Sequence, residues 1–322
     1  MATTDQSLNA PSVSVGMSRK PKDQGLARQQ RIWGWIFLSP WIIGFILFTA
    51  LPILVSLAFT FTDFTLTSTQ EMRFVGLDNW VRLFTDPIAM TALGVTLRFA
   101  LIAVPFGILI PLGMAAMLNS KNLWGKVLWR PLFYMPYVVP AISSIFVWQS
   151  FLNGDTGWLN RILRGVGIAE PPNWIQDANW ILPAFMLVGV WGVGNAMLTM
   201  LATMQGVPTE LYEAADVDGA NPLVKFLRIT LPMISPVILY NLVLSVIGLM
   251  QYFTVPYVMT RGTGNPGNSA LFFNMYLYKT AFQNANMGYG ATQAWFIFII
   301  ALVLTVALFG TSRRWVYYSS GD

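Results

Sequence analysis

The stretch ELYEAADVDGANPLVKFLRITLP, residues 210–232, places a run of charged side chains between two long apolar segments. Four acidic residues come first in it, and one Lys and one Arg follow. Elsewhere the chain avoids charge: only 10% of its 322 residues are Asp, Glu, Lys or Arg, whereas 55% are hydrophobic. Ionised side chains are costly to bury in apolar surroundings. The stretch is therefore predicted to lie in water, between segments that do not.

The apolar segments on both sides are long enough to cross a membrane. The mean hydropathy of the chain is +0.56, and its charged fraction is far below the roughly 25% of soluble proteins. A membrane-spanning helix needs about 20 mainly apolar residues. Six segments qualify: 32–61, 94–118, 132–152, 181–204, 234–257 and 293–312. The sequence therefore predicts an all-α membrane protein with six transmembrane helices.

The basic residues are distributed unevenly between the two sides of such a protein. Twelve of the 19 Lys and Arg residues fall on the side that holds both termini and the 205–233 loop. Because cytoplasmic loops carry an excess of Lys and Arg, we expect a multi-pass cell-membrane protein with both termini in the cytoplasm. The predicted divisions are a disordered cytoplasmic tail 1–31, a first transmembrane helix 32–61, an external loop 62–91, a core 92–312 and a cytoplasmic tail 313–322.

Several kinds of chemistry are excluded by the residues that the chain lacks. It contains no Cys and no His, so thiol catalysis and imidazole proton transfer are impossible. No Asp or Glu falls inside the six predicted spans, and Arg98 lies near the outer end of the second, where its side chain could reach the interface. The GTGNPG segment, residues 262–267, is followed by Asn268 where a phosphate-binding loop needs Lys. We expect no catalytic residues, no metal site, no cofactor bound by this chain and no nucleic-acid partner.

Local signals in the 205–233 loop predict a helix, a turn and a second helix. Thr209 is suited to cap the first helix and Gly219 to end it in a left-handed conformation. Asn221 followed by Pro222 is a typical restart. The loop could lie on the membrane surface as an amphipathic element, or it could dock a soluble partner. Its small alanines and its acidic first half favour docking, since an anionic leaflet repels carboxylates.

This loop resembles the signature loop of permease subunits of ATP-binding-cassette importers. The family pattern is E-A-A, three residues, G, nine residues and I-x-L-P. The chain matches it at Glu213-Ala214-Ala215, Gly219, Ile229, Leu231 and Pro232. Two further segments resemble the sugar-permease branch, and within it the first subunit of maltose permeases. These are YMPYVVPAISSIFVWQSFLNGDTGWLN (134–160) and MYLYKTAFQNANMGYGAT (275–292).

The resemblance implies a type I importer bundle whose signature loop is a cytoplasmic coupling helix seated in a separate ATPase. The residues that it assigns to that contact are Glu213, Ala214, Ala215, Asp216 and Gly219. The implied partners are two ATP-binding-cassette subunits, a second and distinct permease subunit, an extracellular or periplasmic solute-binding protein and membrane lipid. ATP and Mg²⁺ would be used by the ATPase, so the permease itself would be no enzyme. The implied solute is a sugar or a related polyol.

A polar seam is the candidate substrate pathway through the spans. Asn241, Ser245, Gly248 and Tyr252 share one helical stripe of the fifth predicted span, and Asn195 and Thr199 are neighbours in the fourth. Hydroxyl, amide and aromatic groups suit a sugar, although polar and small residues also serve as packing contacts between membrane helices. Two other functions stay open: an importer permease for another solute, such as an amino acid or polyamine, and a stand-alone secondary carrier.

Overall fold

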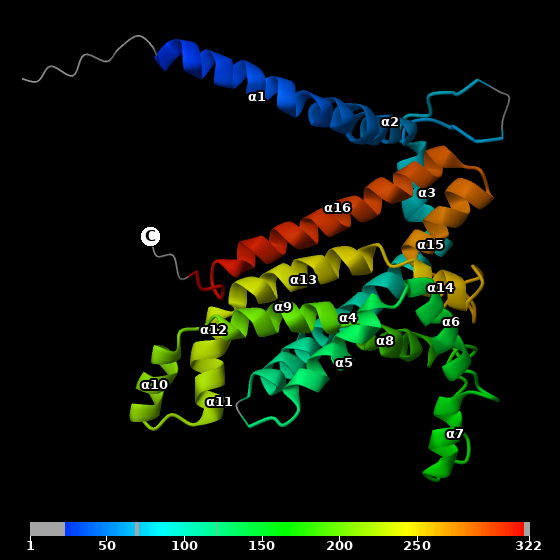
Figure 1. Cartoon of the computed structure of the whole chain (residues 1–322). Helices are drawn as coiled ribbons and strands as arrows, with labels where there is room; N and C mark the ends of the chain where they lie inside the picture. The colour runs from blue at the N-terminus through cyan, green and yellow to red at the C-terminus, as the bar shows by residue number, and fades with distance from the viewer. Residues whose placement is uncertain (1–22, 68–70, 121, 319–322) are drawn as a thin grey trace, which may run out of the picture. The chain divides into compact units, whose positions relative to one another are not determined.

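The structure is a computed structural model that describes residues 23–67, 71–120 and 122–318. The chain forms two compact units, residues 1–55 and 56–322, which are described separately. In the first unit, α1 (Asp23–Phe45) continues through a π-helical turn, η1 (Ile46–Ala50), into α2 (Leu51–Phe59), which crosses the boundary. All the helices that follow belong to the second unit (Figure 1).

The second unit is built from helices of very different lengths. In chain order they are α3 (Asp78–Thr85), α4 (Pro87–Asn119), α5 (Lys126–Val138), α6 (Ala141–Phe151), α7 (Trp158–Gly165), α8 (Ile181–Trp191), α9 (Gly194–Gln205), α10 (Thr209–Val217), α11 (Pro222–Lys225), η2 (Phe226–Thr230), α12 (Leu231–Met233), α13 (Ser235–Met250), α14 (Thr254–Met259), α15 (Phe273–Tyr278), η3 (Lys279–Gln283) and α16 (Met287–Ser312). Across the described residues, β-structure is limited to two isolated bridges, Thr62 with Phe74 and Thr65 with Asn286.

The predicted spans are present as helices, but not all of them are continuous. Four helical segments of the described residues are long and apolar enough to cross a membrane: Arg28–Phe59, Pro87–Asn119, Ser235–Met259 and Met287–Ser312. Two bent helix pairs raise the number to six if each pair is one span. The helical membrane class is therefore confirmed, and the two bent pairs correspond to the predicted third and fourth spans.

Both bends have causes that can be identified in the chain. The third predicted span breaks by 99° between α5 and α6, where Val139 is extended and Pro140 precedes α6. A residue before Pro avoids the helical conformation, so the predicted continuous helix over 132–152 is wrong. The fourth span bends by 47° at Gly192. Just beyond the bend, a Cβ on Gly194 would lie 2.6 Å from the Phe133 carbonyl oxygen, so α9 can approach α5 only because Gly194 has no side chain.

The boundaries predicted near the N-terminus also need correction. Residues 23–31 are helical, where composition predicted a disordered tail; the rest of that predicted tail lies outside the described residues. The predicted external loop 62–91 contains α3 and the first turn of α4. Asp86 caps α4 by accepting hydrogen bonds from the backbone N–H groups of Ile88, at 2.9 Å, and Ala89, at 3.2 Å. Its cap starts the helix well before the most apolar part of the sequence.

Asp86 also joins α4 to two helices that are distant in sequence. Its Oδ2 accepts hydrogen bonds from the hydroxyls of Tyr276, at 2.6 Å, and Tyr289, at 2.7 Å. Burial alone would raise the pKa of Asp86, but the two tyrosine hydroxyls and the capped backbone outweigh it and hold that pKa below its usual value. Burial and the neighbouring carboxylate raise the pKa of Tyr276 to about 12. We call Asp86, Tyr276 and Tyr289 the carboxylate hub.

The long helices of the second unit pack side by side. α4 lies against α9 and α13, and α16 runs along α13 (Figure 1). Between α4 and α9 the core is rich in methionine, and Met197, Met200 and Met204 are all buried. Methionine is unbranched and fills irregular gaps between helices. The resulting bundle presents α10 and α11 together at one end and α6, α7 and α14 at the other.

Candidate functional site

The helix–turn–helix predicted in the charged loop is present, with its turn at Gly219. α10 ends in a Schellman motif: the Ala220 N–H donates to the Ala215 carbonyl at 2.9 Å, and the Gly219 N–H donates to the Asp216 carbonyl at 3.1 Å. Gly219 has φ of +71°, and a Cβ on it would meet nothing within 4 Å. Glycine is therefore required by the left-handed backbone and not by lack of space. The predicted left-handed helix end is confirmed.

The second helix of the loop starts as the sequence predicts. The Asn221 side chain accepts a hydrogen bond from the Val224 N–H at 2.9 Å, and Pro222 is the first helical residue. The first helix starts differently: α10 begins at Thr209 after Pro208 and has no side-chain cap. The prediction that Thr209 caps this helix is therefore wrong.

Two side-chain contacts hold the loop helices at a fixed angle. Lys225 pairs with Asp216 of α10 at 2.5 Å. The Tyr212 hydroxyl lies 2.8 Å from the Thr230 hydroxyl, which is buried. One contact joins α10 to α11 and the other joins α10 to η2, so α10 is tied at two points along its length. Asp216, which the family resemblance assigns to the ATPase contact, is thus already engaged within the loop.

The surface of α10 combines carboxylates with uncovered apolar side chains. Glu213 and Ala214 are exposed and Ala215 is half-buried. Leu211 is 41% exposed and Val217 is 90% exposed. None of the residues of α10 is buried. Leu211, Ala214 and Val217 are therefore accessible to another molecule, whereas Ala215 is partly covered within the chain.

The residues of the predicted polar seam separate into two places. Asn241 is buried and donates hydrogen bonds to the Thr199 hydroxyl at 3.2 Å and to the Val237 carbonyl at 2.8 Å. These two seam residues therefore meet each other where α9 faces α13. Asn195, one helical turn before Thr199 on α9, is exposed. The amide of Asn241 is satisfied by protein atoms, as expected of a contact between membrane helices.

The other three seam residues line one cavity. Ser245, Gly248 and Tyr252 of the 235–259 span face a space of about 260 Å³ between α4, α8 and α13. The remaining lining residues are Phe99, Ala103, Phe106, Gly107, Phe185, Met186, Gly189, Val190, Val193 and Leu249. A small number of hydroxyls in a mainly apolar and aromatic wall is the usual composition of a small-molecule site.

Aromatic rings close the end of this cavity that carries Tyr252. The Phe99 ring stacks on Tyr252 with centroids 5.1 Å apart, and Phe272 meets Phe99 edge-on at 5.2 Å and Tyr252 at 5.0 Å. Phe185 extends the cluster, 6.0 Å from Phe272. We call these four side chains the aromatic cover. Sequence reasoning missed Phe99, Phe185 and Phe272, because nothing distinguishes them from the many other apolar residues of their segments.

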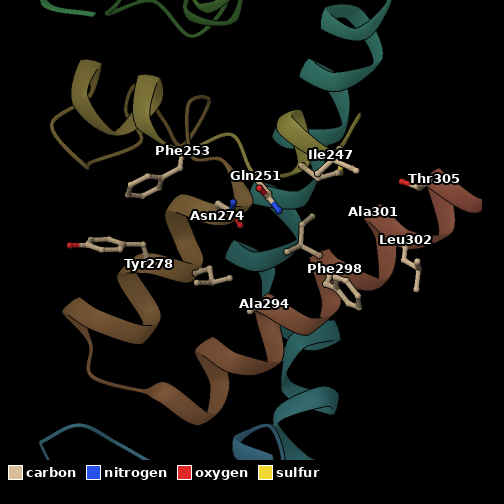
Figure 2. Close-up of a pocket in the computed structure, with 13 residues that line it drawn as sticks. Ile247, Gln251, Phe253, Asn274, Tyr278, Ala294, Phe298, Ala301, Leu302 and Thr305 are labelled. Carbon is tan, nitrogen blue, oxygen red and sulfur yellow. The ribbon is translucent and has the colours of Figure 1, made fainter. Parts of the chain in front are cut away.

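A larger groove lies elsewhere and matches the predicted seam less well. It measures about 650 Å³, lies between α13, α15 and α16, and is mainly apolar. Figure 2 shows Gln251 and Asn274 near its middle, and Phe298 and Leu302 on α16. None of the six predicted pathway residues lines it. The cavity between α4, α8 and α13 is therefore the better candidate solute site. The described residues contain no group of three or more acidic side chains arranged to hold a metal ion.

Comparisons with known proteins identify the family of the chain. The chain matches the family model described as "Binding-protein-dependent transport system inner membrane component" over residues 107–319. It is 35% identical to the probable ABC transporter permease protein YesP of Bacillus subtilis, covering 92% of this chain and 95% of YesP. It is 33% identical to the lactose transport system permease protein LacF of Rhizobium radiobacter, covering 90% of this chain and 97% of LacF.

A solved structure has the same fold. One chain in the crystal structure of a bacterial alginate ABC transporter, in complex with its alginate pentasaccharide-bound periplasmic protein, matches with a TM-score of 0.76 at 22% identity. The match covers 90% of this chain and 96% of that one. Together with the family model and the two relatives, this likeness confirms the resemblance of the signature loop. The chain belongs to the family of inner-membrane permease components of binding-protein-dependent ABC transport systems.

Proposed function

We propose that this permease forms one half of a translocation pathway for a carbohydrate, with the cavity between α4, α8 and α13 as its contribution to the solute site. The observation that carries the proposal is the convergence of Ser245, Gly248 and Tyr252 on that cavity. Hydroxyls can exchange hydrogen bonds with sugar hydroxyls, and aromatic rings offer flat apolar faces. The name of LacF, a lactose transport system permease, supports this solute class.

The cavity is small for a complete sugar site. Small-molecule sites usually occupy about 300–1,000 Å³, and this cavity measures about 260 Å³. We expect a second permease subunit to contribute the rest of the site. We expect that subunit to be a distinct chain, and we expect the solute to arrive on a binding protein, as the family description implies.

The accessible surface of α10 is the proposed contact with the ATPase. Glu213 and Ala214 are exposed on it, and Leu211 and Val217 leave apolar area uncovered. A helix of this kind can insert into a groove of a soluble partner. We expect two ATP-binding-cassette subunits to bind and hydrolyse ATP with Mg²⁺, so that this chain catalyses no reaction. The basic-residue bias supports a cytoplasmic position for this loop and both termini.

The test reconstitutes the complete transporter in vesicles with its binding protein and ATP. Gly248→Leu should fill the cavity, because nothing lies within 4 Å of the position of its Cβ. We expect solute uptake to be lost while the ATPase still co-purifies. Gly310→Leu is the matched control, since Gly310 is also a helical glycine with nothing within 4 Å but lies on α16 outside the cavity.

The contact with the ATPase is tested in the same preparation. Glu213→Lys should remove the ATPase from the purified complex, because loss of one partner of a buried charged contact can cost about 2–5 kcal/mol. Normal uptake by Gly248→Leu would contradict the cavity assignment, and normal co-purification with Glu213→Lys would contradict the loop assignment. Uptake by this chain alone without ATP would instead identify a stand-alone carrier.

A further inference from the structure

One cation lies within a membrane-spanning helix. Arg98 is the only charged residue between Pro87 and Asn119. In the predicted span 94–118, Arg98 lies near the outer end. The observed helix α4 begins earlier, at Pro87. At 1.5 Å per residue α4 is about 50 Å long, and Arg98 lies about 17 Å from its first residue. The hydrocarbon core is only about 30 Å thick, so a core centred on α4 begins about 10 Å along the helix and Arg98 lies just inside its outer boundary. An unpaired guanidinium is costly there as well.

The described part of the chain offers Arg98 no anionic partner. Within the described residues, its side chain is exposed and makes no ion pair or hydrogen bond. The sequence from Gln24 to Thr62, which includes the first span, contains no Asp or Glu. Asp86, the nearest acid in sequence, is occupied by the cap of α4 and by two tyrosine hydroxyls. The counter-charge must therefore come from another molecule.

Arg98 stands at the edge of an apolar groove on the outside of the bundle. The groove measures about 510 Å³ and lies between α4, α13 and α16. Its other lining residues are Leu97, Ala100, Leu101, Val104, Pro105, Val246, Met250 and Leu304. Every one of them is apolar. The groove thus combines a single cation with a trough that suits a hydrocarbon chain.

The groove faces away from the solute cavity. Arg98, Leu101 and Pro105 follow one another at i, i+3 and i+7 along α4, whereas Phe99, Ala103 and Phe106 line the cavity. At 100° per residue the two sets are centred roughly 130° apart around the helix. If the cavity faces the second permease, as the proposed function requires, the groove faces the bilayer.

We propose that this groove binds an anionic phospholipid, with an acyl chain along the apolar trough and the headgroup phosphate paired with Arg98. Guanidinium and phosphate form strong charge-assisted hydrogen bonds. The long arginine side chain can extend along the helix toward the headgroup region. A free phosphate ion would leave the trough uncovered and would have to enter the bilayer, so the lipid is the fitting source of the charge.

The experiment uses the complete transporter in nanodiscs of phosphatidylcholine with a minor fraction of phosphatidylglycerol that carries a photoreactive acyl chain. After illumination, labelled peptides are identified by mass spectrometry. We expect adducts within 97–105, at Val246 or Met250, or at Leu304. Arg98→Gln should lower this labelling about fivefold, the effect of one basic residue on binding to anionic lipid. Arg98→Lys should retain most of it. Arg73→Gln, which removes an exposed cation outside the spans, should change nothing.

Competition identifies the source of the phosphate. Unlabelled phosphatidylglycerol should displace the probe, whereas inorganic phosphate should not. Equal labelling in Arg98→Gln, or displacement by inorganic phosphate, would overturn the proposal. A third outcome would also overturn it. If a photoreactive amino acid placed at position 101 in place of Leu101 crosslinks to another polypeptide, a protein and not a lipid covers the groove. This experiment measures lipid labelling and not solute uptake. Its outcome is therefore independent of whether Gly248→Leu blocks transport.

Discussion

Removal of one hydroxyl tests whether the carboxylate hub holds the second unit together. Tyr289→Phe deletes the donor that lies 2.7 Å from Asp86 and leaves the ring in place. Tyr289 is fully buried, and the Arg82 guanidinium lies 4.1 Å from the centre of its ring. No cavity of consequence forms, so the loss is that of one hydrogen bond to a charged acceptor. Such a bond contributes about 1.5–3 kcal/mol.

Thermal unfolding of the purified transporter measures this loss. One kcal/mol shifts the unfolding temperature of a domain of this size by about 2–4 °C, so a loss of about 2 kcal/mol predicts a fall of roughly 4–8 °C. All variants are heated at the same rate, because membrane complexes unfold irreversibly. Tyr240→Phe is the matched control, since Tyr240 is 56% exposed and its hydroxyl has no hydrogen bond in the described part of the chain.

The double variant sharpens the test. With both hydroxyls removed, as in Tyr276→Phe combined with Tyr289→Phe, Oδ2 of Asp86 keeps its charge but loses both of its donors. The combined loss should exceed the sum of the single losses, because the second removal leaves a partly buried carboxylate oxygen unpaired. An unfolding temperature unchanged in both single variants would refute the hub as a source of stability.

The pH dependence of the hub follows from its two shifted groups. The pKa of Asp86 is lowered in the folded protein. The contribution of Asp86 to the free energy of unfolding is therefore fully present above the ordinary carboxyl pKa, and it is lost as the pH falls through the lowered value. The pKa of Tyr276 is raised to about 12. The contribution of Tyr276 to the free energy of unfolding is therefore fully present below the ordinary phenol pKa, and it is lost as the pH rises toward 12. The difference in unfolding temperature between the native chain and Tyr276→Phe should therefore be constant from about pH 5 to pH 9.

Two further predictions concern the loop and the topology. Gly219→Val should introduce about 1–2 kcal/mol of backbone strain and weaken ATPase binding. Gly219→Asn should retain most of the ATPase binding, because Asn tolerates left-handed conformations. Equal co-purification of the ATPase with both variants would contradict a role for the φ of +71° at this position. Because the chain has no Cys, single cysteines can be labelled without background. Val127→Cys, at a position that is 90% exposed, should react from the cytoplasm only, and Val166→Cys, at a position that is 73% exposed, from outside only. Labelling of position 127 in intact cells by an impermeant reagent would reverse the proposed orientation.

The signature loop could be predicted in detail because its signals are local. Gly219 and Asn221 act within four residues of their own positions, so their conformations follow from backbone sterics and capping alone. The positions of the apolar spans were also predictable from composition. The break before Pro140 was visible as a residue type, but its 99° angle depends on packing with other helices and has no sequence signature.

The cavity between α4, α8 and α13 and the hub could be predicted only in part, because they depend on distant contacts. The period of 3.6 residues correctly placed Ser245, Gly248 and Tyr252 together, but it could not show that Asn241 turns toward Thr199, 42 residues away. Asp86 contacts partners 190 and 203 residues further along the chain. Nothing in a single sequence links residues at such separations, so these contacts became visible only in the fold.

The aromatic cover has a consequence for how well the protein prevents leakage. Phe99, Tyr252 and Phe272 each touch the other two rings, so an opening at that end must break three ring contacts together. At about 0.5–1.5 kcal/mol for each contact, the cost is roughly 1.5–4.5 kcal/mol. Thermal motion alone would then open this end in about one molecule in ten to one in two thousand. Under the proposed function, this cost keeps that end of the cavity closed in most molecules, and a partner with a few kcal/mol of preference for the open state is enough to offset it.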